Sequence, residues 1–333
     1  MHTPLVPELD HLQRAYAVTS KATQQTPLIE SAALAKVTGA ARVFVKPESL
    51  QWAGSFKVRG AYWRLKQLSA AEAKRGVVAY SSGNFAQGLA AAGEALGIPV
   101  TIVMPIDAPA AKREATAGYG ARVVITDHGQ RAREEVAAEK AREIAGEEGL
   151  VLLHPFDDPE IVAGQAGAGL EGLAQLEAKG ASVDLLFCAV GGGGLIGGVA
   201  LAFHYLSPTT EIIAVEPAGF NSMGHSLDQG EIETLPLAPN SICDGLMARR
   251  PGVAPFAALR TARARGLAVD DASVRKAMKI AFERMKLVLE PSGAASLAAL
   301  LGGKIDVAGK NVLVIATGGN VSLADFMKHV ADA

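Results

Sequence analysis

The sequence is poor in cysteine, in long apolar runs and in uncompensated charge. Only 2 of its 333 residues are cysteines, and Cys188 and Cys243 lie too far apart for a local metal site, which favours a reduced, cytoplasmic setting. The formal net charge of -2 gives no electrostatic reason to expect nucleic acid or an anionic membrane surface. Neither a secretory signal nor an uninterrupted apolar run of about eighteen residues is found, so we expect no membrane span.

Hydrophobic residues make up 49% of the chain and form short runs that alternate with helical patterns. From residue 76 we expect strands at "GVVAY", "PVTIVMP" and "ARVVITD", then a charged helix over 131–148 and a strand at "VLLHPF". The pattern restarts with a helix over 164–178, strands at "VDLLFCAV", "EIIAVEP" and "KNVLVIATGGN", and "GGGGLIGG" as a turn. Strands that are apolar throughout indicate parallel sheets covered on both faces. The sequence therefore predicts an α/β fold of two units, with a break near residues 152–160.

Four consecutive glycines, Gly191 to Gly194, stand between an expected strand and an expected helix. Glycines let the backbone approach a ligand, and the positive end of the following helix suits a phosphate. A tight turn that packs a strand against a helix is the alternative. Gly192, Gly194 and Gly197 also satisfy the GxGxxG pattern, and Glu216 ends the next strand, as in dinucleotide-binding folds. The loop alone therefore leaves a nicotinamide-dependent oxidoreductase open.

Two more polar turns follow expected strands. "SSGNFAQG", residues 81–88, opens a helix whose N-terminus suits a carboxylate, although serine and asparagine are also ordinary helix caps. "ATGGN", residues 316–320, puts the Thr317 hydroxyl at the end of a core strand, where it meets a bound ring or bonds only its own turn. Because ligands of open α/β sheets bind beyond the carboxyl ends of the strands, all three turns belong at such edges.

Lys57 stands in "SFKVRGA", between a phenylalanine and a valine. One interpretation is structural, with a packed alkyl stem and an ammonium that reaches water. The other is chemical, because desolvation lowers the pKa of a lysine and a neutral amine attacks aldehydes. The seven residues alone leave both open.

Together these segments resemble the fold type II pyridoxal 5′-phosphate (PLP) enzymes, in particular the serine/threonine dehydratase and serine racemase family. The matching segments follow one another in order over most of the chain: "SFKVRGA", "SSGNFAQG", "HPFDDPEIVAGQ", "AVGGGGLIGG", "ICDGL", "ERMKLVLEPSGAA" and "ATGGN". The resemblance implies a tryptophan synthase β-like fold with two open, mainly parallel sheets flanked by helices. It also implies a large PLP-binding domain (1–75 and 154–333), a small mobile domain that closes over the substrate (76–153) and a homodimer.

The resemblance implies a role for each matching residue. Lys57 would be the Schiff-base lysine and the base at the substrate Cα. Asn84 would hydrogen-bond the ring 3-hydroxyl, and Thr317 would face the ring nitrogen, where a neutral hydroxyl suits β-elimination better than transamination. The remaining cofactor contacts would be Gly191, Gly192, Gly193, Gly194 and Leu195 to the phosphate, and Phe56 and Gly245 to the two ring faces.

The turn after the first small-domain strand is implied to bind the substrate carboxylate. The implied substrate residues are Ser81, Ser82, Gly83, Asn84, Phe85 and Arg133. Ser82 is similar to the proton-exchanging serine of the racemases, so it is a second candidate catalytic residue. Phe85 replaces the family's usual histidine, which opens the site to bulkier or aryl-bearing substrates. Ser222 stands where metal-binding relatives carry a carboxylate after Glu216, so we expect no metal site.

The implied function is that of a PLP-dependent lyase, which dehydrates and deaminates a β-hydroxy amino acid such as L-threonine or L-serine to a 2-oxo acid and ammonia. Four alternatives remain: an amino-acid racemase, a dehydratase for a phenylserine or hydroxyaspartate, the nicotinamide-dependent oxidoreductase, and a ligand-binding homologue without activity. The implied partner is a small amino acid, with neither nucleic acid nor membrane.

Overall fold

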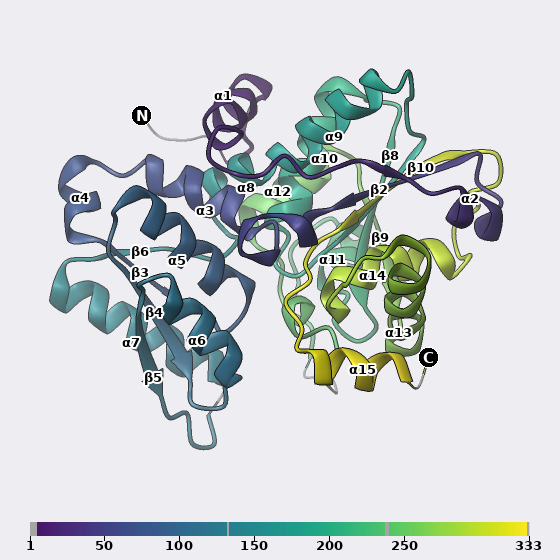
Figure 1. The fold of residues 1–333 in the computed structure, drawn as a ribbon. Coiled ribbons are helices and arrows are strands. Elements are labelled where there is room, and N and C mark those ends of the chain that lie inside the picture. The colour runs from purple at the N-terminus through teal and green to yellow at the C-terminus, as the bar shows by residue number, and fades with distance from the viewer. Residues whose placement is uncertain (1–4, 132, 237–239, 332) are drawn as a thin grey trace.

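Two separate sheets organise the chain, as the computed structural model shows for residues 5–131, 133–236, 240–331 and 333 (Figure 1). One sheet has six strands in the order β1-β2-β10-β7-β8-β9, and the other has four in the order β5-β4-β3-β6. All neighbouring strands run parallel except β1 and β2. The predicted fold of two mainly parallel sheets flanked by helices is confirmed.

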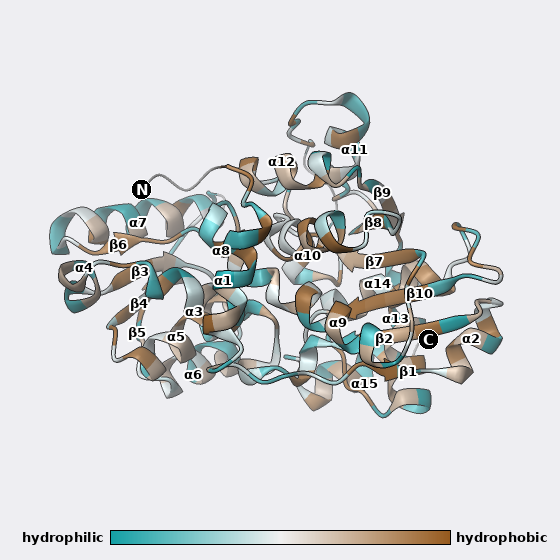
Figure 2. Cartoon of the chain, turned by 90° about the horizontal axis from the view of Figure 1, so that it is seen from above, coloured by the Kyte–Doolittle hydropathy of each residue, from teal (hydrophilic) through white to brown (hydrophobic). Residues whose placement is uncertain are grey.

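The six-stranded sheet is built from apolar runs whose side chains alternate between two buried faces. On β7, for example, Phe187 faces one hydrophobic cluster while Leu186 and Cys188 face another. Its strands β7 and β10 are coloured as hydrophobic in Figure 2. The strands are β1 Ile29–Glu30, β2 Arg42–Pro47, β7 Leu185–Ala189, β8 Glu211–Pro217, β9 Arg265–Val269 and β10 Asn311–Ala316.

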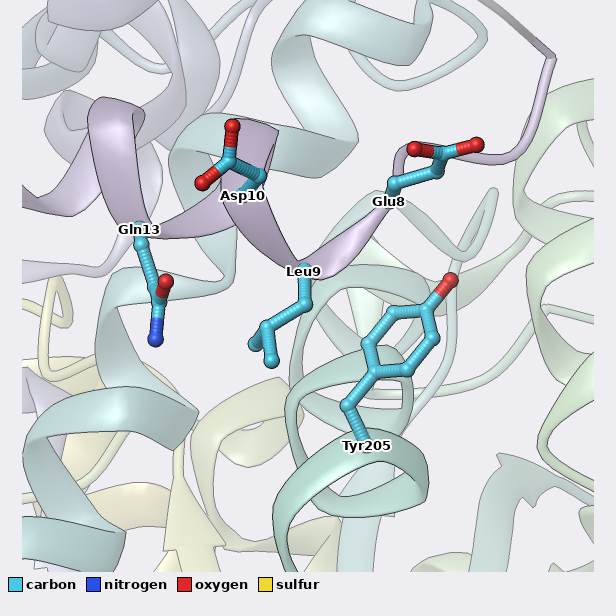
Figure 3. A pocket seen from close by; sticks show the side chains of 5 residues that line it. All are labelled: Glu8, Leu9, Asp10, Gln13 and Tyr205. Carbon is cyan, nitrogen blue, oxygen red and sulfur yellow. The ribbon is translucent and has the colours of Figure 1, made fainter.

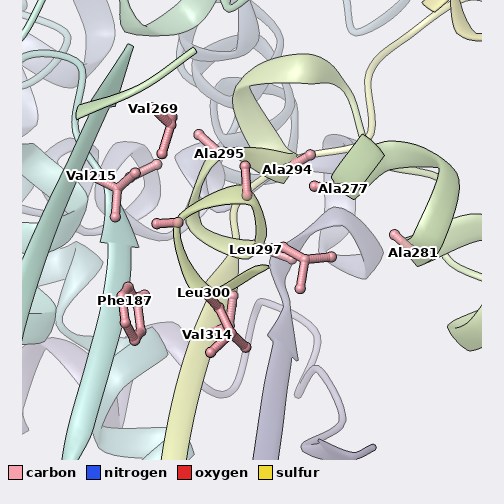
Figure 4. Packing of buried hydrophobic residues seen from close by; sticks show 14 of the residues in the cluster. Phe187, Val215, Val269, Ala277, Ala281, Ala294, Ala295, Leu297, Leu300 and Val314 are labelled. Carbon is pink, nitrogen blue, oxygen red and sulfur yellow. The ribbon is translucent and has the colours of Figure 1, made fainter. Parts of the chain in front are cut away.

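Helices cover both faces of this sheet. On one face Leu297 and Leu300 of α14 pack against Phe187 and Val314 (Figure 4), and α2, α13 and α15 belong to the same side. On the other face α9 and α10 pack against β7, β8 and β10, with α12 and α11 beside them. These helices are α2 Ala32–Thr38, α9 Gly167–Ala178, α10 Gly194–Leu206, α11 Ser222–Gln229, α12 Val253–Thr261, α13 Asp271–Ile280, α14 Pro291–Leu301 and α15 Leu323–Ala331.

The four-stranded sheet lies between α5 on one face and α7 on the other. Its strands are β3 Val77–Tyr80, β4 Val100–Pro105, β5 Arg122–Thr126 and β6 Val151–Leu152, and its helices are α4 Ala70–Arg75, α5 Asn84–Leu96, α6 Ala110–Gly118 and α7 Arg133–Glu148. Figure 1 shows this sheet apart from the larger one, within the span predicted for the small domain. That residues 76–153 move as one closing unit stays a prediction.

Helix α3 (Lys57–Lys66) lies at the junction of the two sheets, packed against α5 and α8 (Pro159–Gln165). Glycines permit this close packing. A Cβ on Gly88 of α5 would lie 2.9 Å from the Cβ of Lys57, and one on Gly164 of α8 would lie 2.7 Å from the Cα of Gly60. Both distances are too short for real side chains, so these glycines fix how closely α3 approaches its neighbours.

A buried network of charges holds α3 from behind. Arg59 donates to Glu48 at 2.7 Å and to Glu171 at 3.1 Å, and Lys46 donates to Glu171 at 2.6 Å. All four charged side chains are at most 1% exposed. Because a buried charge without a partner is costly, this network ties α3 to β2 and α9 in one arrangement.

Three local expectations are wrong. The helix expected over 164–178 is two helices, α8 and α9, and the first begins at Pro159 with an Asp158 cap. The "GGGGLIGG" segment is not a turn throughout, because α10 already begins at Gly194. In "VLLHPF" only two residues, those of β6, pair with β3.

The remaining helices complete the fold. Helix α1 (Leu9–Thr19) packs against α8, α9 and α10. Short helical turns are η1 Glu48–Leu50, η2 Trp52–Gly54, η3 Asp244–Leu246 and the π-helical η4 Ala281–Met285. None of the helices in the described part of the chain is long and apolar enough to cross a membrane.

Candidate active site

Lys57 is the first residue of α3, and its side-chain nitrogen lies against two aromatic rings. The Nζ atom is 5.0 Å from the centre of the Phe56 ring and 5.7 Å from that of Phe85. Burial lowers the pKa of Lys57 to about 8, and the nearby Glu290 carboxylate opposes this shift. A lysine with this pKa is partly neutral at physiological pH, as a nucleophilic amine or a proton-abstracting base must be.

The carboxyl end of β10 meets the start of α3. The backbone N–H of Phe56 donates to the carbonyl of Thr317 at 3.3 Å, and Ser55 pairs with Gly318 in an isolated bridge. Thr317 is buried, and its hydroxyl donates to the Ser292 carbonyl at 3.4 Å. This predicted ring-nitrogen residue therefore lies beside the lysine segment, although the two are far apart in sequence.

Ser292 links Thr317 to Gly245 and to the glycine loop. Its hydroxyl accepts a hydrogen bond from the backbone N–H of Gly245 at 3.0 Å. The glycine loop lies against Gly245, because a Cβ on Gly191 would lie 2.6 Å from the Gly245 carbonyl oxygen. The structure thus brings Gly245, Thr317 and the glycine loop to one place.

The glycine loop has the geometry of a tight turn, and it also leaves the start of a helix free for an anion. A Cβ on Gly192 would lie 2.1 Å from the Phe156 ring, and Gly193 has a left-handed φ of +99°, so packing and turn geometry do require glycine. Helix α10, which starts at Gly194, has no side chain capping its N-terminus. Its first N–H groups are those that a phosphate would accept from. Leu195 follows in the first turn and is buried in the core.

The turn "SSGNFAQG" also precedes a helix whose N-terminus has no side-chain cap. Helix α5 begins at Asn84 with Gly83 as its cap residue, and no side chain caps this N-terminus. The Ser81 hydroxyl accepts a hydrogen bond from the N–H of Gly83 at 3.3 Å. Arg133, the first residue of α7, donates to the Ser82 hydroxyl at 3.0 Å and to Asp107 at 3.0 Å. An uncapped helix N-terminus beside an arginine suits a carboxylate.

The Asn84 side chain is held from both ends. Its Nδ2 donates to the Glu290 carboxylate, and its Oδ1 accepts from Asn320 Nδ2 at 2.9 Å. Asn320 also donates to the Ala53 carbonyl at 2.9 Å. The sequence patterns indicated Asn84, but they assigned no role to Glu290, Asn320 or Ser292. The only local signal is that Glu290 is a lone acid in the apolar run "LVLEPSGAA".

Phe85 is only 2% exposed and packs in the cluster that contains Val58, Leu89 and Met104. Its ring contributes to the apolar surroundings of Lys57. A role for Phe85 in selecting the substrate stays a prediction.

The Glu216 carboxylate is occupied by backbone donors. Its two carboxylate oxygens accept the backbone N–H groups of Met223 and Gly224, each at 2.8 Å. Burial raises its pKa to about 8, against the effect of these two donors. Ser222 donates to the Ala248 carbonyl at 3.0 Å. Glu216 thus caps the N-terminus of α11. Its two oxygens are therefore not free to bind a ribose, as the nicotinamide alternative requires.

A surface hollow lies elsewhere, between the start of α1 and the end of α10 (Figure 3). It is lined by Glu8, Leu9, Asp10, Gln13 and Tyr205. It contains none of the predicted site residues. One of its two carboxylates, Asp10, is already paired with Arg14.

The residues present fit PLP. Two uncapped helix N-termini, those of α5 and α10, provide donors for anions. Lys57, with its lowered pKa, packs against α5 at Gly88. The Ser55 hydroxyl, two residues before Lys57, is buried without a hydrogen-bond partner in the described part of the chain, so a polar group can still be accommodated there. The site is therefore that of an enzyme using an aldehyde cofactor with a phosphate group.

Comparison with known proteins identifies the family. A family model described as "Pyridoxal-phosphate dependent enzyme" matches residues 19–318. The chain is 42% identical over 302 residues to an L-threo-3-hydroxyaspartate ammonia-lyase of Pseudomonas sp (91% of this chain, 92% of the relative). It is 38% identical over 315 residues to the L-threonine ammonia-lyase of Thermotoga maritima (95% and 76%). The structure of maize serine racemase superposes with a TM-score of 0.89 at 34% identity, covering 97% of each chain.

The chain belongs to the family of pyridoxal-phosphate dependent enzymes, and its cofactor is PLP. This confirms the family, the fold type and the cofactor that the sequence motifs indicated. Within this frame, Lys57 would hold the cofactor, the start of α10 its phosphate, Asn84 its 3-hydroxyl and Thr317 its ring nitrogen.

Proposed function

We propose that the protein catalyses the PLP-dependent β-elimination of a β-hydroxy amino acid to a 2-oxo acid and ammonia. The observation that carries the proposal is Lys57, whose pKa burial lowers to about 8 and whose helix packs against α5. Helices α5 and α10 both begin without a side-chain cap. Two similar proteins named above are ammonia-lyases, for L-threo-3-hydroxyaspartate and for L-threonine.

The protein residues divide the work as follows. The N-terminus of α5 and Arg133 receive the substrate carboxylate and so orient its Cα. The neutral Nζ of Lys57 then removes the Cα proton, since a lysine with a pKa near 8 is an effective base at physiological pH. Bound PLP supplies a conjugated ring that disperses the negative charge left at Cα. Thr317 offers that ring a neutral hydroxyl instead of a carboxylate, which favours elimination over transamination.

Exclusion of water is the task of the walls around the lysine. Phe56 and Phe85 surround Nζ, and Phe156 packs against the glycine loop. The four-stranded sheet carries the carboxylate-binding turn, so a movement of residues 76–153 toward the larger sheet would close the site over the substrate.

The substrate is chosen among hydroxy amino acids that differ at Cβ. L-Threonine and L-serine require only the carboxylate site, whereas hydroxyaspartate needs a cation for its second carboxylate. Arg133 and Lys112 are the basic groups that approach from α7 and α6. A phenylserine would need apolar space, and Phe85 is already packed in the core.

Racemisation is a second candidate, and one contact favours it. The Ser82 hydroxyl oxygen accepts a hydrogen bond from Arg133, which stabilises the deprotonated form of Ser82, so the hydroxyl can give up its proton more readily. Serine at this position on the opposite side from a lysine can return a proton to the other face of Cα. A homodimer, which rests on the family resemblance, and a cytoplasmic setting, which rests on the two scattered cysteines, complete the proposal.

The experiment is a substrate panel with two readouts. The PLP-loaded protein is mixed with L-serine, L-threonine, L-threo-3-hydroxyaspartate and L-threo-phenylserine, while 2-oxo acid release and optical rotation are followed. Release of 2-oxo acid from at least one of them supports the lyase. Loss of optical rotation without 2-oxo acid would instead support the racemase, and no reaction with any would refute both.

A further inference from the structure

A carboxylate is buried at the junction where the cofactor residues meet. Glu290 immediately precedes α14 and is 3% exposed. Its backbone N–H donates to the Gly318 carbonyl at 3.1 Å, and a Cβ on Gly318 would lie 2.2 Å from Glu290 Oε1. The same Cβ would lie 3.1 Å from Asn84 Nδ2, so glycine at position 318 leaves room for the carboxylate beside the Asn84 amide.

The contact between Glu290 and Asn84 joins segments 206 residues apart in the chain. Asn84 Nδ2 donates to Glu290 Oε1, while Asn84 Oδ1 accepts from Asn320. A side-chain amide has two N–H groups and one oxygen, so this pair of contacts leaves one N–H over. The flipped amide would place its oxygen against the Glu290 carboxylate and its N–H groups against the donor of Asn320. Only one orientation of Asn84 satisfies both neighbours.

Charged groups from several elements act on Glu290. Burial raises its pKa to about 7, and Asp244 of η3 adds to the rise. Lys112 of α6, the Asn84 amide and Lys57 of α3 lower it. A buried acid surrounded in this way needs a hydrogen-bond donor, and Asn84 is the one donor to its carboxylate among the described residues.

We propose that Glu290 is a positioning residue for the cofactor: by holding the Asn84 amide in one orientation, it directs the remaining N–H of Asn84 toward the ring 3-oxygen of PLP. This inference rests on the proposed role of the site and deepens it. Glu290 acts through Asn84, so its effect on the cofactor exists only while Asn84 is present. A carboxylate that merely stabilised the fold would act independently of Asn84.

The test is a double-mutant cycle read out by PLP affinity. Apoprotein is prepared for wild type, Glu290→Leu, Asn84→Ala and the double variant, and the PLP dissociation constant is measured by titration. Loss of one well-oriented hydrogen bond corresponds to about a tenfold weaker affinity. We expect this loss for Glu290→Leu in the wild-type background and less than about a twofold change in the Asn84→Ala background.

Two further variants separate positioning from folding. Glu290→Gln keeps a side-chain oxygen that can accept from Asn84, so it recovers most of the PLP affinity lost in Glu290→Leu. Glu283→Gln changes an exposed acid seven residues upstream and leaves the affinity and the visible spectrum of bound PLP unchanged. The spectrum of Glu290→Leu shifts with that of Asn84→Ala, because both alter the environment of the ring 3-oxygen.

Several results would overturn the inference. An equal loss of affinity from Glu290→Leu with and without Asn84 would show that Glu290 acts on its own. Wild-type affinity in Glu290→Leu would show that it does not act on the cofactor at all. If wild type binds PLP and releases 2-oxo acid while either result holds, only this inference fails; if wild type binds no PLP, the proposed function fails with it.

Discussion

The side-chain nitrogen of Lys57 lies 5.0 Å from the centre of the neighbouring Phe56 ring. An aromatic face attracts an ammonium, yet enclosure by protein atoms outweighs this attraction and lowers the pKa of Lys57 to about 8. Burial, to which the rings of Phe56 and Phe85 contribute, thus favours the neutral amine. Two interpretations of "SFKVRGA" remained at the sequence level, and the structure favours the chemical one.

The rate of PLP uptake by the apoprotein should follow this pKa. Below pH 8 Lys57 is an ammonium and cannot attack the cofactor aldehyde, so the uptake rate rises with pH and levels off above a midpoint near 8. Glu290→Gln removes a nearby charge that favours the ammonium, so it moves the midpoint to lower pH. Stopped-flow absorbance over pH 6–10 measures both. A midpoint near the ordinary lysine value of about 10.4 would contradict the account.

Removing Arg59 should destabilise the protein far more than removing a surface arginine. Arg59→Met leaves Glu48 as a buried charge without its ion-pair partner, while Glu171 keeps only Lys46, at a cost of about 3–5 kcal/mol in the free energy of unfolding. The control is Arg14→Met, whose ion pair with Asp10 is 60% and 81% exposed and contributes less than about 1 kcal/mol. Urea denaturation of both variants and the wild type measures these losses in the free energy of unfolding. Equal costs would show that the network does not anchor α3.

The ion pair between Lys112 of α6 and Asp244 of η3 joins a helix of the smaller sheet to the segment that contains Gly245. If residues 76–153 close over the substrate, this pair favours the closed form. Lys112→Asp should therefore raise KM for the best substrate about fivefold, with a smaller effect on kcat, and adding Asp244→Lys should restore it. Steady-state kinetics at low and high salt measure this. Failure of the exchanged pair to restore KM would argue against a closing contact.

Divalent cations should leave the stability of the protein unchanged. Both oxygens of Glu216 accept backbone N–H groups, and Ser222 replaces the carboxylate that a second ligand would require. No group of three or more potential metal ligands occurs in the part of the chain that the structure describes. Thermal melts in EDTA, Mg²⁺ and Ca²⁺ should agree within about 1 °C. A saturable rise of several degrees with either cation would contradict this.

The sequence predicted those elements whose signal is local. Strands β3, β4, β5, β7, β8 and β10 follow from apolar runs, and the three turns at their carboxyl ends follow from glycine and hydroxyl residues. Strand β2 was missed because it contains Lys46, a charge that is buried only because Glu171, 125 residues away, accepts its hydrogen bond. The edge strand β9 was missed because most of its residues are only partly buried.

Within the site, too, the residues with a local sequence signal were predicted and those fixed by distant contacts were not. Lys57, Asn84, Thr317 and the glycine loop stand in recognisable short segments, and the structure brings them together. Glu290 and Asn320 act through contacts with Asn84 across 206 and 236 residues, which no local pattern encodes. The sequence predicts one helix over 164–178 where the structure has the end of α8 and all of α9, because the residues of both helices are small and apolar. The position of α8 is fixed by a tertiary contact, the packing of Gly164 against Gly60, which the sequence does not show.

The central claim is that Lys57 binds the cofactor, and borohydride reduction tests it most directly. PLP-loaded protein is reduced, digested and mapped by mass spectrometry, because reduction converts a lysine–PLP bond into a stable secondary amine. We expect a phosphopyridoxyl group on the peptide that contains Lys57, loss of visible absorbance, and no such adduct in Lys57→Ala. An unmodified Lys57 in a protein that binds PLP, or modification of a different lysine, would contradict it.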